Sequence, residues 1–269
     1  MQKDSPIGIF DSGFGGLSVT KSIHDLLPNE KLFYVADSAF TPYGDLPESD
    51  ILKRSILITD FLANKKNVKA IVVACNTATA FAINELRKKF HIPIIGMDPA
   101  VKPALKVTLN NKIGVLATSG TSKSIKFSAL LESHHEKAKF YIQPCPGLVN
   151  EIENGKLNGP DLYNLLDKFL ENFKKNAVDT IVLGCTHYIY IKPIIQKIMG
   201  PGISIIETGE AVARQLKSKL DEFNLNENTL VSNNLIKIIL TDTNRNSSHK
   251  IDQFLAESNI EFEIENSWR

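Results

Sequence analysis

The 269-residue sequence predicts an α/β fold of two domains that are related by pseudo-twofold symmetry, each with a mostly parallel central sheet. Short apolar runs alternate with longer segments in which apolar residues recur three and four positions apart, as strands alternate with helices in such folds. A segment of the first half also recurs in the second half. The 43% hydrophobic and 23% charged fractions are those of a globular chain.

The expected strands are short and apolar, and the expected helices have apolar residues on one face. The strands are Ile7–Phe10, Leu32–Ala36, Ala70–Ala74, Ile113–Ala117, Phe140–Gln143, Thr180–Gly184, Ile203–Ile206 and Leu235–Leu240. The helices include Ile51–Ala63, Ala78–Phe90, Leu162–Phe173 and Ala211–Phe223. The polar, asparagine-rich stretch Asn224–Asn234 predicts a loop.

The internal repeat consists of two pairs of similar segments. Ile7–Gly13 resembles Ile113–Gly120 with one inserted residue, at an offset of 113 − 7 = 106. Ala70–Thr77 resembles Thr180–His187, at an offset of 185 − 75 = 110 between their cysteines. Buried strands resemble one another in general, but a cysteine ends both members of the second pair. The similar offsets indicate two related halves.

The chain is expected to cross between its two domains twice. We predict that residues 1–97 and 208–269 form the first domain and residues 98–207 the second. A chain of two related halves often closes by returning to the domain in which it began. The stretch after about Asp221 carries few motifs, and its place in the first domain rests on this argument alone.

Charge and composition exclude several classes of partner. The formal charge is +1, from 31 basic and 30 acidic residues, so no global field favours nucleic acid or an anionic membrane. No apolar stretch reaches the roughly 20 residues of a membrane span, and Met1–Pro6 lacks a signal-peptide pattern. We therefore expect a cytoplasmic protein. The three cysteines are odd in number and widely spaced, which argues against a disulfide framework.

Cys75 and Cys185 each follow a predicted buried strand and precede a predicted helix. Ligands of open α/β sheets bind at such strand ends, and a helix start lowers a thiol pKa. If the two thiols face each other across a cleft, one removes a proton from a carbon and the other returns a proton to its opposite face. The alternative is that each is a small buried apolar residue. Cys145 lies between two prolines without a counterpart, and we interpret it as structural or incidental.

Other groups at these corners have chemistry that suits a small anionic ligand. The segment Asp11–Gly16 joins a strand to a helix and is rich in glycine, so its N–H groups can bind a carboxylate, although a plain capped turn is the alternative. Asp11 is expected to hold or relay a proton beside Cys75, and His187 to tune Cys185. Thr118 and Thr121 occupy the equivalent corner of the second half.

Together these motifs resemble the aspartate/glutamate racemase family. The matching segments are Phe10–Val19, Pro42–Gly44, Ala74–Ala78 and Leu183–Tyr188, within a resemblance that extends from about Ile7 to Ala213. The departures, such as Ala36-Asp37 in place of the family's usual Gly-Asp, do not touch the two cysteine motifs.

The resemblance implies two α/β domains with the active site at their interface, and interconversion of L- and D-glutamate without pyridoxal phosphate, metal or nucleotide. By it, Cys75 takes the proton from D-glutamate and Cys185 takes it from L-glutamate. The assisting residues fall on Asp11, His187 and, through a looser alignment, Glu153. The substrate contacts fall on Asp11, Ser12, Tyr43, Gly44, Asn76, Thr77, Thr118, Thr121, Thr186 and His187. It further implies a bacterial homodimer that supplies D-glutamate for peptidoglycan.

Several alternatives stay open at this point. An aspartate or other acidic amino-acid racemase would use the same thiols, and assays of glutamate against aspartate separate the two. A two-domain binding protein for a small anion needs no thiol at each strand end. A cysteine hydrolase using Cys185 and His187 leaves Cys75 unexplained, and a cysteine metal site lacks a short paired spacing.

Overall fold

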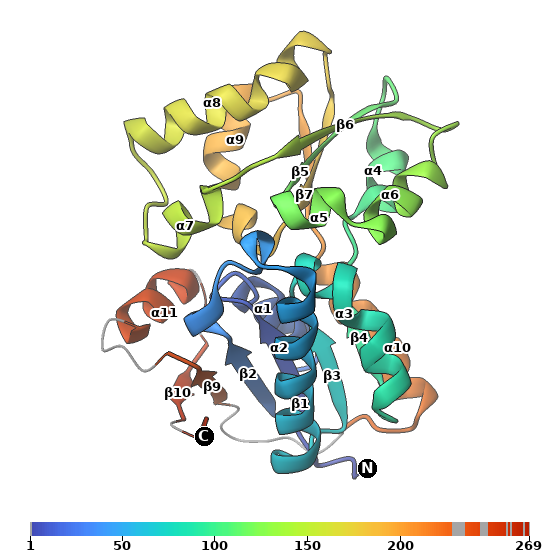
Figure 1. Cartoon of the computed structure of the whole chain (residues 1–269), viewed down its shortest axis with the longest axis vertical. Helices are drawn as coiled ribbons and strands as arrows, with labels where there is room; N and C mark the ends of the chain where they lie inside the picture. Colours follow the sequence, from blue (N-terminus) through green and yellow to red (C-terminus); the bar gives the residue numbers. More distant parts are fainter. Residues whose placement is uncertain are drawn as a thin grey trace.

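The computed structural model describes residues 2–227, 235–242, 247–256, 258, 260–265 and 267–268. Two parallel sheets lie one above the other, each covered by helices on both faces, and both chain ends lie in the lower domain (Figure 1). The predicted α/β fold with two domains is confirmed. Within the described residues, no helix is long and apolar enough to cross a membrane.

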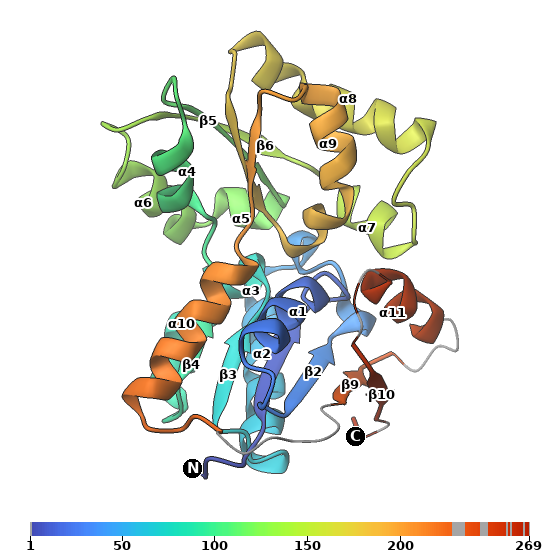
Figure 2. The same ribbon diagram turned by 180° about the vertical axis from the view of Figure 1, so that it is seen from behind.

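The lower sheet has the strand order β10-β9-β2-β1-β3-β4, and every pair in it is parallel. Its strands are β1 (Ile7–Asp11), β2 (Leu32–Ala36), β3 (Ala70–Val73), β4 (Ile94–Gly96), β9 (Ile236–Leu240) and β10 (Phe262–Ile264). The helices α2 (Glu48–Asp60) and α3 (Asn76–Lys89) cover one face, and α1 (Leu17–Leu26) and α10 (Gly209–Glu222) cover the other (Figures 1 and 2). The remaining elements of this domain are η1 (Ser38–Phe40), η2 (Tyr43–Asp45), the π-helical turn η3 (Phe61–Lys65) and α11 (Ser247–Leu255).

The upper sheet has the strand order β6-β5-β7-β8, again entirely parallel. Its strands are β5 (Lys112–Ala117), β6 (Lys139–Pro144), β7 (Thr180–Gly184) and β8 (Ser204–Ile206). Its helices are α4 (Val101–Val107), α5 (Ser119–Lys123), α6 (Ile125–Glu132), α7 (Leu148–Glu153), α8 (Pro160–Lys175), η4 (Thr186–Ile191) and α9 (Lys192–Met199).

The internal repeat is visible in both strand order and register. The neighbours β4-β3-β1-β2 of the lower sheet correspond to β8-β7-β5-β6 of the upper sheet. Ile7 pairs with Ala70, and Ile113 pairs with Thr180, which reproduces the offsets 113 − 7 = 106 and 180 − 70 = 110. Equivalent strand ends of the two domains therefore carry the two cysteines.

The predicted strands are all present among the described residues, with small differences at their ends. The strands β4 and β10, of three residues each, were not predicted. The helix α2 begins three residues before its predicted start and ends as the π-helical turn η3. Of the predicted loop Asn224–Asn234, residues 228–234 lie outside the described residues. The exact domain boundaries after residues 97 and 207 stay a prediction.

Burial explains why the central strands are continuously apolar. Helices on both faces leave no polar side for β1, β3 and β7, and every residue in these strands is buried. One apolar cluster continues from the lower domain through Phe14 to Leu148 and Ile152 of the upper domain. The two domains therefore share part of their core around the ends of the strands.

A buried ion pair lies at the opposite end of the lower sheet. Lys69 Nζ is 2.5 Å from Glu30 Oε2, and the exposed fractions of the two side chains are 0% and 2%. We expect Lys69→Met to lower the free energy of unfolding by about 3–5 kcal/mol, because it leaves a buried carboxylate without its counter-charge. Urea unfolding measures the change. Lys21→Met is the control, since the Lys21–Asp25 pair is exposed and should contribute below about 1 kcal/mol. Equal losses in both variants would contradict this assignment.

Candidate active site

The carboxyl ends of the strands meet at the interface between the domains, and the two predicted thiols share one cavity there. Cys75 follows β3 and Cys185 follows β7, with exposed fractions of 5% and 7%. The space between them is narrow, with about 10 Å³ open to the centre of a water molecule. It is lined by Asp11, Ser12, Pro42, Tyr43, Gly44, Cys75, Asn76, Thr77, Thr118, Val149, Cys185, Thr186 and His187. Every predicted site residue is in this lining except Thr121 and Glu153, which lie directly behind it.

Cys75 caps the helix α3. Its Sγ accepts a hydrogen bond from the Ala78 N–H at 3.4 Å, as expected for a thiol at a helix start. Burial and the nearby carboxylate of Asp11 nevertheless raise its pKa well above the ordinary value. The expectation that the helix start lowers this pKa is therefore wrong for Cys75, because the cost of burying a thiolate outweighs one N–H donor.

Asp11 is completely buried at the end of β1, beside Cys75. One carboxylate oxygen accepts the Ser12 N–H at 2.6 Å, and the other accepts the Gly16 N–H at 2.6 Å and the Thr186 hydroxyl at 3.1 Å. Burial raises the pKa of this carboxyl even though these hydrogen bonds and a nearby imidazole favour its ionised form. Asp11 thus lies beside the thiol with which it is expected to exchange a proton.

On the opposite side, Cys185, His187 and Glu153 form a chain of polar contacts. His187 Nδ1 is 3.6 Å from Cys185 Sγ, and His187 Nε2 is 2.5 Å from Glu153 Oε1. Burial alone would lower the pKa of His187, but the contacts with Cys185 and Glu153 raise it well above the ordinary value. The imidazole therefore favours its charged form, which stabilises a neighbouring thiolate.

This chain of contacts is completed by the glycine turn of the other domain. The N–H of Phe14 donates to Glu153 Oε1 at 2.8 Å, and the backbone nitrogen of Gly15 lies 3.2 Å from His187 Nε2. A Cβ atom on Gly15 would lie 2.5 Å from His187 Nδ1, and one on Gly13 would overlap Glu153 Oε1. Glycine is required at both positions because side chains from the upper domain occupy that space.

Three threonine hydroxyls form a second polar corner across the interface. The Oγ1 atoms of Thr77, Thr118 and Thr121 are each 3.0 Å from the other two. Thr77 belongs to α3, whereas Thr118 caps α5 and accepts the Thr121 N–H at 3.1 Å. The predicted corner of Thr118 and Thr121 is therefore joined by Thr77 of the other domain.

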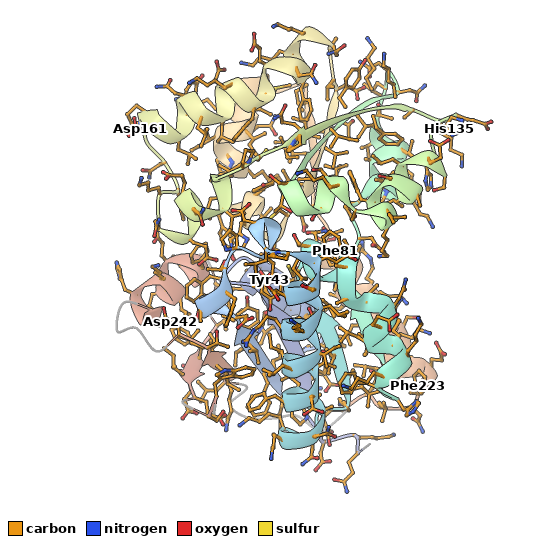
Figure 3. The ribbon with its side chains drawn as sticks, in the orientation of Figure 1. Tyr43, Phe81, His135, Asp161, Phe223 and Asp242 are labelled. Atoms are coloured by element: carbon orange, nitrogen blue, oxygen red, sulfur yellow. The ribbon has the colours of Figure 1, made fainter. Side chains whose placement is uncertain are left out.

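Asn76 and Tyr43 are held by contacts outside the cavity. Asn76 Nδ2 donates to the Met97 carbonyl at 3.1 Å, and its buried Oδ1 has no hydrogen-bond partner among the described residues. The Tyr43 hydroxyl donates to Asp37 at 2.5 Å, and Arg54 binds both oxygens of the same carboxylate. Figure 3 shows Tyr43 near the boundary between the two domains.

Sequence reasoning missed some of the site. Pro42 and Val149 line the cavity, and Asp37 and Arg54 hold Tyr43 from behind. Pro42 belongs to the turn that carries Tyr43, so it had a local signal, whereas Val149 and Arg54 reach the site only through the tertiary fold. Among the described residues, no group of three histidine, cysteine, aspartate or glutamate side chains is arranged to hold a metal ion.

Two thiols from equivalent strand ends, with a carboxylate beside one and an imidazole beside the other, define a protein built for proton transfer to both faces of one carbon. The sequence profile of the family described as Asp/Glu/Hydantoin racemase matches residues 7–216, and the chain belongs to this family.

Proteins named glutamate racemase are similar to this chain over most of its length. The chain is 48% identical over 225 residues to the glutamate racemase of Ectopseudomonas mendocina, covering 83% of this chain and 85% of that protein. The crystal structure of a glutamate racemase isoform from Bacillus anthracis has a TM-score of 0.86 at 30% identity and covers 99% of both chains. The Francisella tularensis glutamate racemase in complex with D-glutamate has a TM-score of 0.84 at 30% identity and covers 98% of both.

The close contact between Gly13 and Glu153 allows a test in which one methyl group is added to the glycine turn. Gly13→Ala must displace the Glu153 carboxylate. We expect turnover to fall about a hundredfold, because displacing a catalytic contact by about 1 Å has effects of that order. Steady-state kinetics and a thermal melt measure activity and folding. Gly202→Ala is the control, since a Cβ there meets nothing within 4 Å. Full activity in Gly13→Ala would show that the placement of Glu153 is unimportant.

The raised pKa of Cys75 predicts its reactivity. Because the thiolate is the nucleophile, alkylation of Cys75 by iodoacetamide should keep accelerating with pH beyond about 9, where a free thiol levels off. Mass spectrometry of the labelled peptide follows the rate at this cysteine, with glutathione as the reference thiol. A rate that is constant above about pH 7.5 would contradict the burial argument.

Proposed function

We propose that this chain interconverts L- and D-glutamate by a two-thiol, cofactor-independent mechanism. The observation that carries the proposal is that Cys75 and Cys185, from opposite domains, line one small buried cavity. The relatives named glutamate racemase and the F. tularensis structure in complex with D-glutamate support glutamate as the substrate. An aspartate racemase remains the second candidate on chemical grounds, but the named relatives favour glutamate.

The proposed proton transfers are balanced between the thiols. From D-glutamate, the Cys75 thiolate takes the α-proton, and the Cys185 thiol then gives its proton to the opposite face of the carbanion. From L-glutamate the roles are exchanged, so each turnover leaves the opposite thiol deprotonated. Between turnovers, Asp11 exchanges with Cys75 the proton that this thiol has gained or lost. His187, held by Glu153, does the same for Cys185.

The raised pKa of Cys75 is consistent with this role. A thiolate of high pKa is a stronger base, and the α-proton of an amino acid is only weakly acidic. The ammonium group of the substrate adds a positive charge to the closed cavity and favours the thiolate when the substrate is bound. The Ala78 N–H, which donates to Cys75 Sγ, acts in the same direction.

The polar groups of the cavity suit an amino acid with two carboxylates. The buried Asn76 Oδ1, which has no hydrogen-bond partner in the described part of the chain, is an acceptor for the ammonium group. The hydroxyls of Thr77, Thr118 and Thr121 are donors for one carboxylate. We assign the other carboxylate to the region of Ser12, Tyr43, Gly44 and Thr186, which the family resemblance implies as substrate contacts.

We further propose that residues 1–97 with 208–269 and residues 98–207 are the two domains, that the protein is a cytoplasmic homodimer, and that it supplies D-glutamate for peptidoglycan. The sheet membership of the strands supports the domain boundaries. The cellular role and the oligomeric state rest on the resemblance to bacterial glutamate racemases.

Exchange with solvent tests the reaction itself. In deuterated water, the protein should place deuterium on the α-carbon of the enantiomer it forms, at the rate at which optical rotation disappears. L- and D-aspartate in parallel assays separate the second candidate. Inversion of glutamate with full retention of the original α-proton would rule out the exchange between solvent and two thiols.

Replacement of each thiol tests the assignment of the bases. Cys75→Ser and Cys185→Ser should each lower kcat/KM by about 10²–10⁴, the contribution of a positioned acid/base group, while the melting temperature changes little. Cys145→Ser is the control, because Cys145 lies outside the cavity lining and should keep nearly full activity. Near-normal racemisation in either of the first two variants would remove that thiol from the mechanism.

A further inference from the structure

Tyr34 ends a line of hydrogen bonds that starts at the Cys185 thiol. It lies in β2, is completely buried, and its hydroxyl donates to the carbonyl oxygen of Gly13 at 2.5 Å. Its ring belongs to the apolar core, which a phenylalanine would fill equally well. The hydroxyl therefore needs an explanation other than packing, because burying it is unfavourable unless it forms a hydrogen bond.

The carbonyl that accepts this hydrogen bond belongs to the same peptide group as the N–H that binds Glu153. The Gly13 C=O and the Phe14 N–H lie in one rigid plane and point in opposite directions. Tyr34 binds the oxygen of this plane at 2.5 Å, and Glu153 binds its N–H at 2.8 Å. Whatever fixes the carbonyl therefore also fixes the direction of the N–H.

From Glu153 the line continues to the proposed base. Glu153 Oε1 is 2.5 Å from His187 Nε2, and His187 Nδ1 is 3.6 Å from Cys185 Sγ. A hydrogen bond to a peptide carbonyl also polarises the group and strengthens its N–H as a donor. Tyr34 thus acts on Glu153 in two ways, through the orientation of the Phe14 N–H and through its donor strength.

The backbone beside the Tyr34 hydroxyl leaves room for it only because glycine lies there. A Cβ atom on Gly16 would lie 2.9 Å from the Tyr34 oxygen, and one on Gly13 would overlap Glu153. Burial and the charges of Asp11 and Glu153 raise the pKa of Tyr34 well above the ordinary value, so the hydroxyl stays protonated and remains a donor.

We propose that Tyr34 is a positioning residue for the Cys185 base, acting through the Gly13–Phe14 peptide group on Glu153 and His187. This inference rests on the proposed function, and it assigns to the first domain a part in setting the geometry of the base carried by the second. Tyr34 contacts neither the cavity nor a thiol directly.

The test is Tyr34→Phe, which removes only the hydroxyl. Because enantiomers have equal free energies, kcat/KM must fall equally in both directions, and we expect a fall of about tenfold, the value of one hydrogen bond in a transition state. The deuterium isotope effect on kcat should rise with α-deuterated L-glutamate, whose proton Cys185 removes. It should fall with α-deuterated D-glutamate, because removal by Cys75 then limits the rate less.

Two further variants sharpen this test. Tyr141→Phe is the control, since it removes a tyrosine hydroxyl from β6, outside the cavity lining, and should change neither isotope effect. Glu153→Gln should reproduce the isotope pattern of Tyr34→Phe. The double variant should lose less than the sum of the two single losses in activation free energy, because both changes act through one chain of contacts.

Each outcome decides the proposal. Opposite changes in the two isotope effects, together with non-additive losses, support it. Unchanged or equally changed isotope effects, additive losses, or a Tyr34→Phe variant that does not fold would overturn it, since each assigns the hydroxyl to general stability. If the unmodified protein does not racemise glutamate, the proposed function fails first, and this inference fails with it.

Discussion

The structure depends on one constraint: two ionisable side chains of the upper domain pack directly against the backbone of the glycine turn in the lower domain. Glu153 and His187 occupy space beside the glycine turn that any Cβ would take. Burying these groups is unfavourable, and the Phe14 N–H compensates for part of that cost. The glycines therefore serve the neighbouring domain as much as their own. The same contacts that join the domains also hold the groups to which the proposed function assigns proton transfer.

The repeated scaffold carries groups that are not repeated. The offset of 106 places Ala117 where the first domain has Asp11 (117 − 11 = 106). The offset of 110 places Thr77 where the second domain has His187 (187 − 77 = 110). The two thiols therefore lie at equivalent strand ends but have different ionisable neighbours, Asp11 for Cys75 and His187 for Cys185. A carboxylate lies beside Cys75 and an imidazole lies beside Cys185, so the two thiols have different electrostatic surroundings although their backbones match.

Much of this could be predicted from the sequence, because strand ends and repeats leave local patterns. Cys75 and Cys185 were recognisable as a pair, since an apolar strand precedes each and the offsets agree. The shift in the pKa of Cys75 was not predictable, because it depends on burial against Asp11. Tyr34 gave no signal at all, since a tyrosine in a buried strand looks like any core residue until the partner of its hydroxyl is known.

The interface combines two kinds of contact with different consequences. On the side of α11, Phe254 of the lower domain meets the edge of Tyr190 of the upper domain at 4.6 Å between ring centroids, and it stacks on Phe14 of its own domain at 5.7 Å. At the cavity, hydrogen bonds join the domains, among them the Thr186 hydroxyl to Asp11. Apolar contacts of this kind depend on exact distance and angle less steeply than hydrogen bonds do, so they hold the domains together with some tolerance in their orientation.

Hydrogen bonds weaken steeply with distance and angle. A small relative shift of the domains would therefore leave the aromatic side of the interface nearly intact while it separates Thr186 from Asp11 and Glu153 from Phe14. The contacts of Asp11 and Glu153 across the interface consequently depend on the relative position of the domains more steeply than the apolar core does. The residues that join the domains at the cavity are therefore the same residues to which the proposed function assigns the proton transfers.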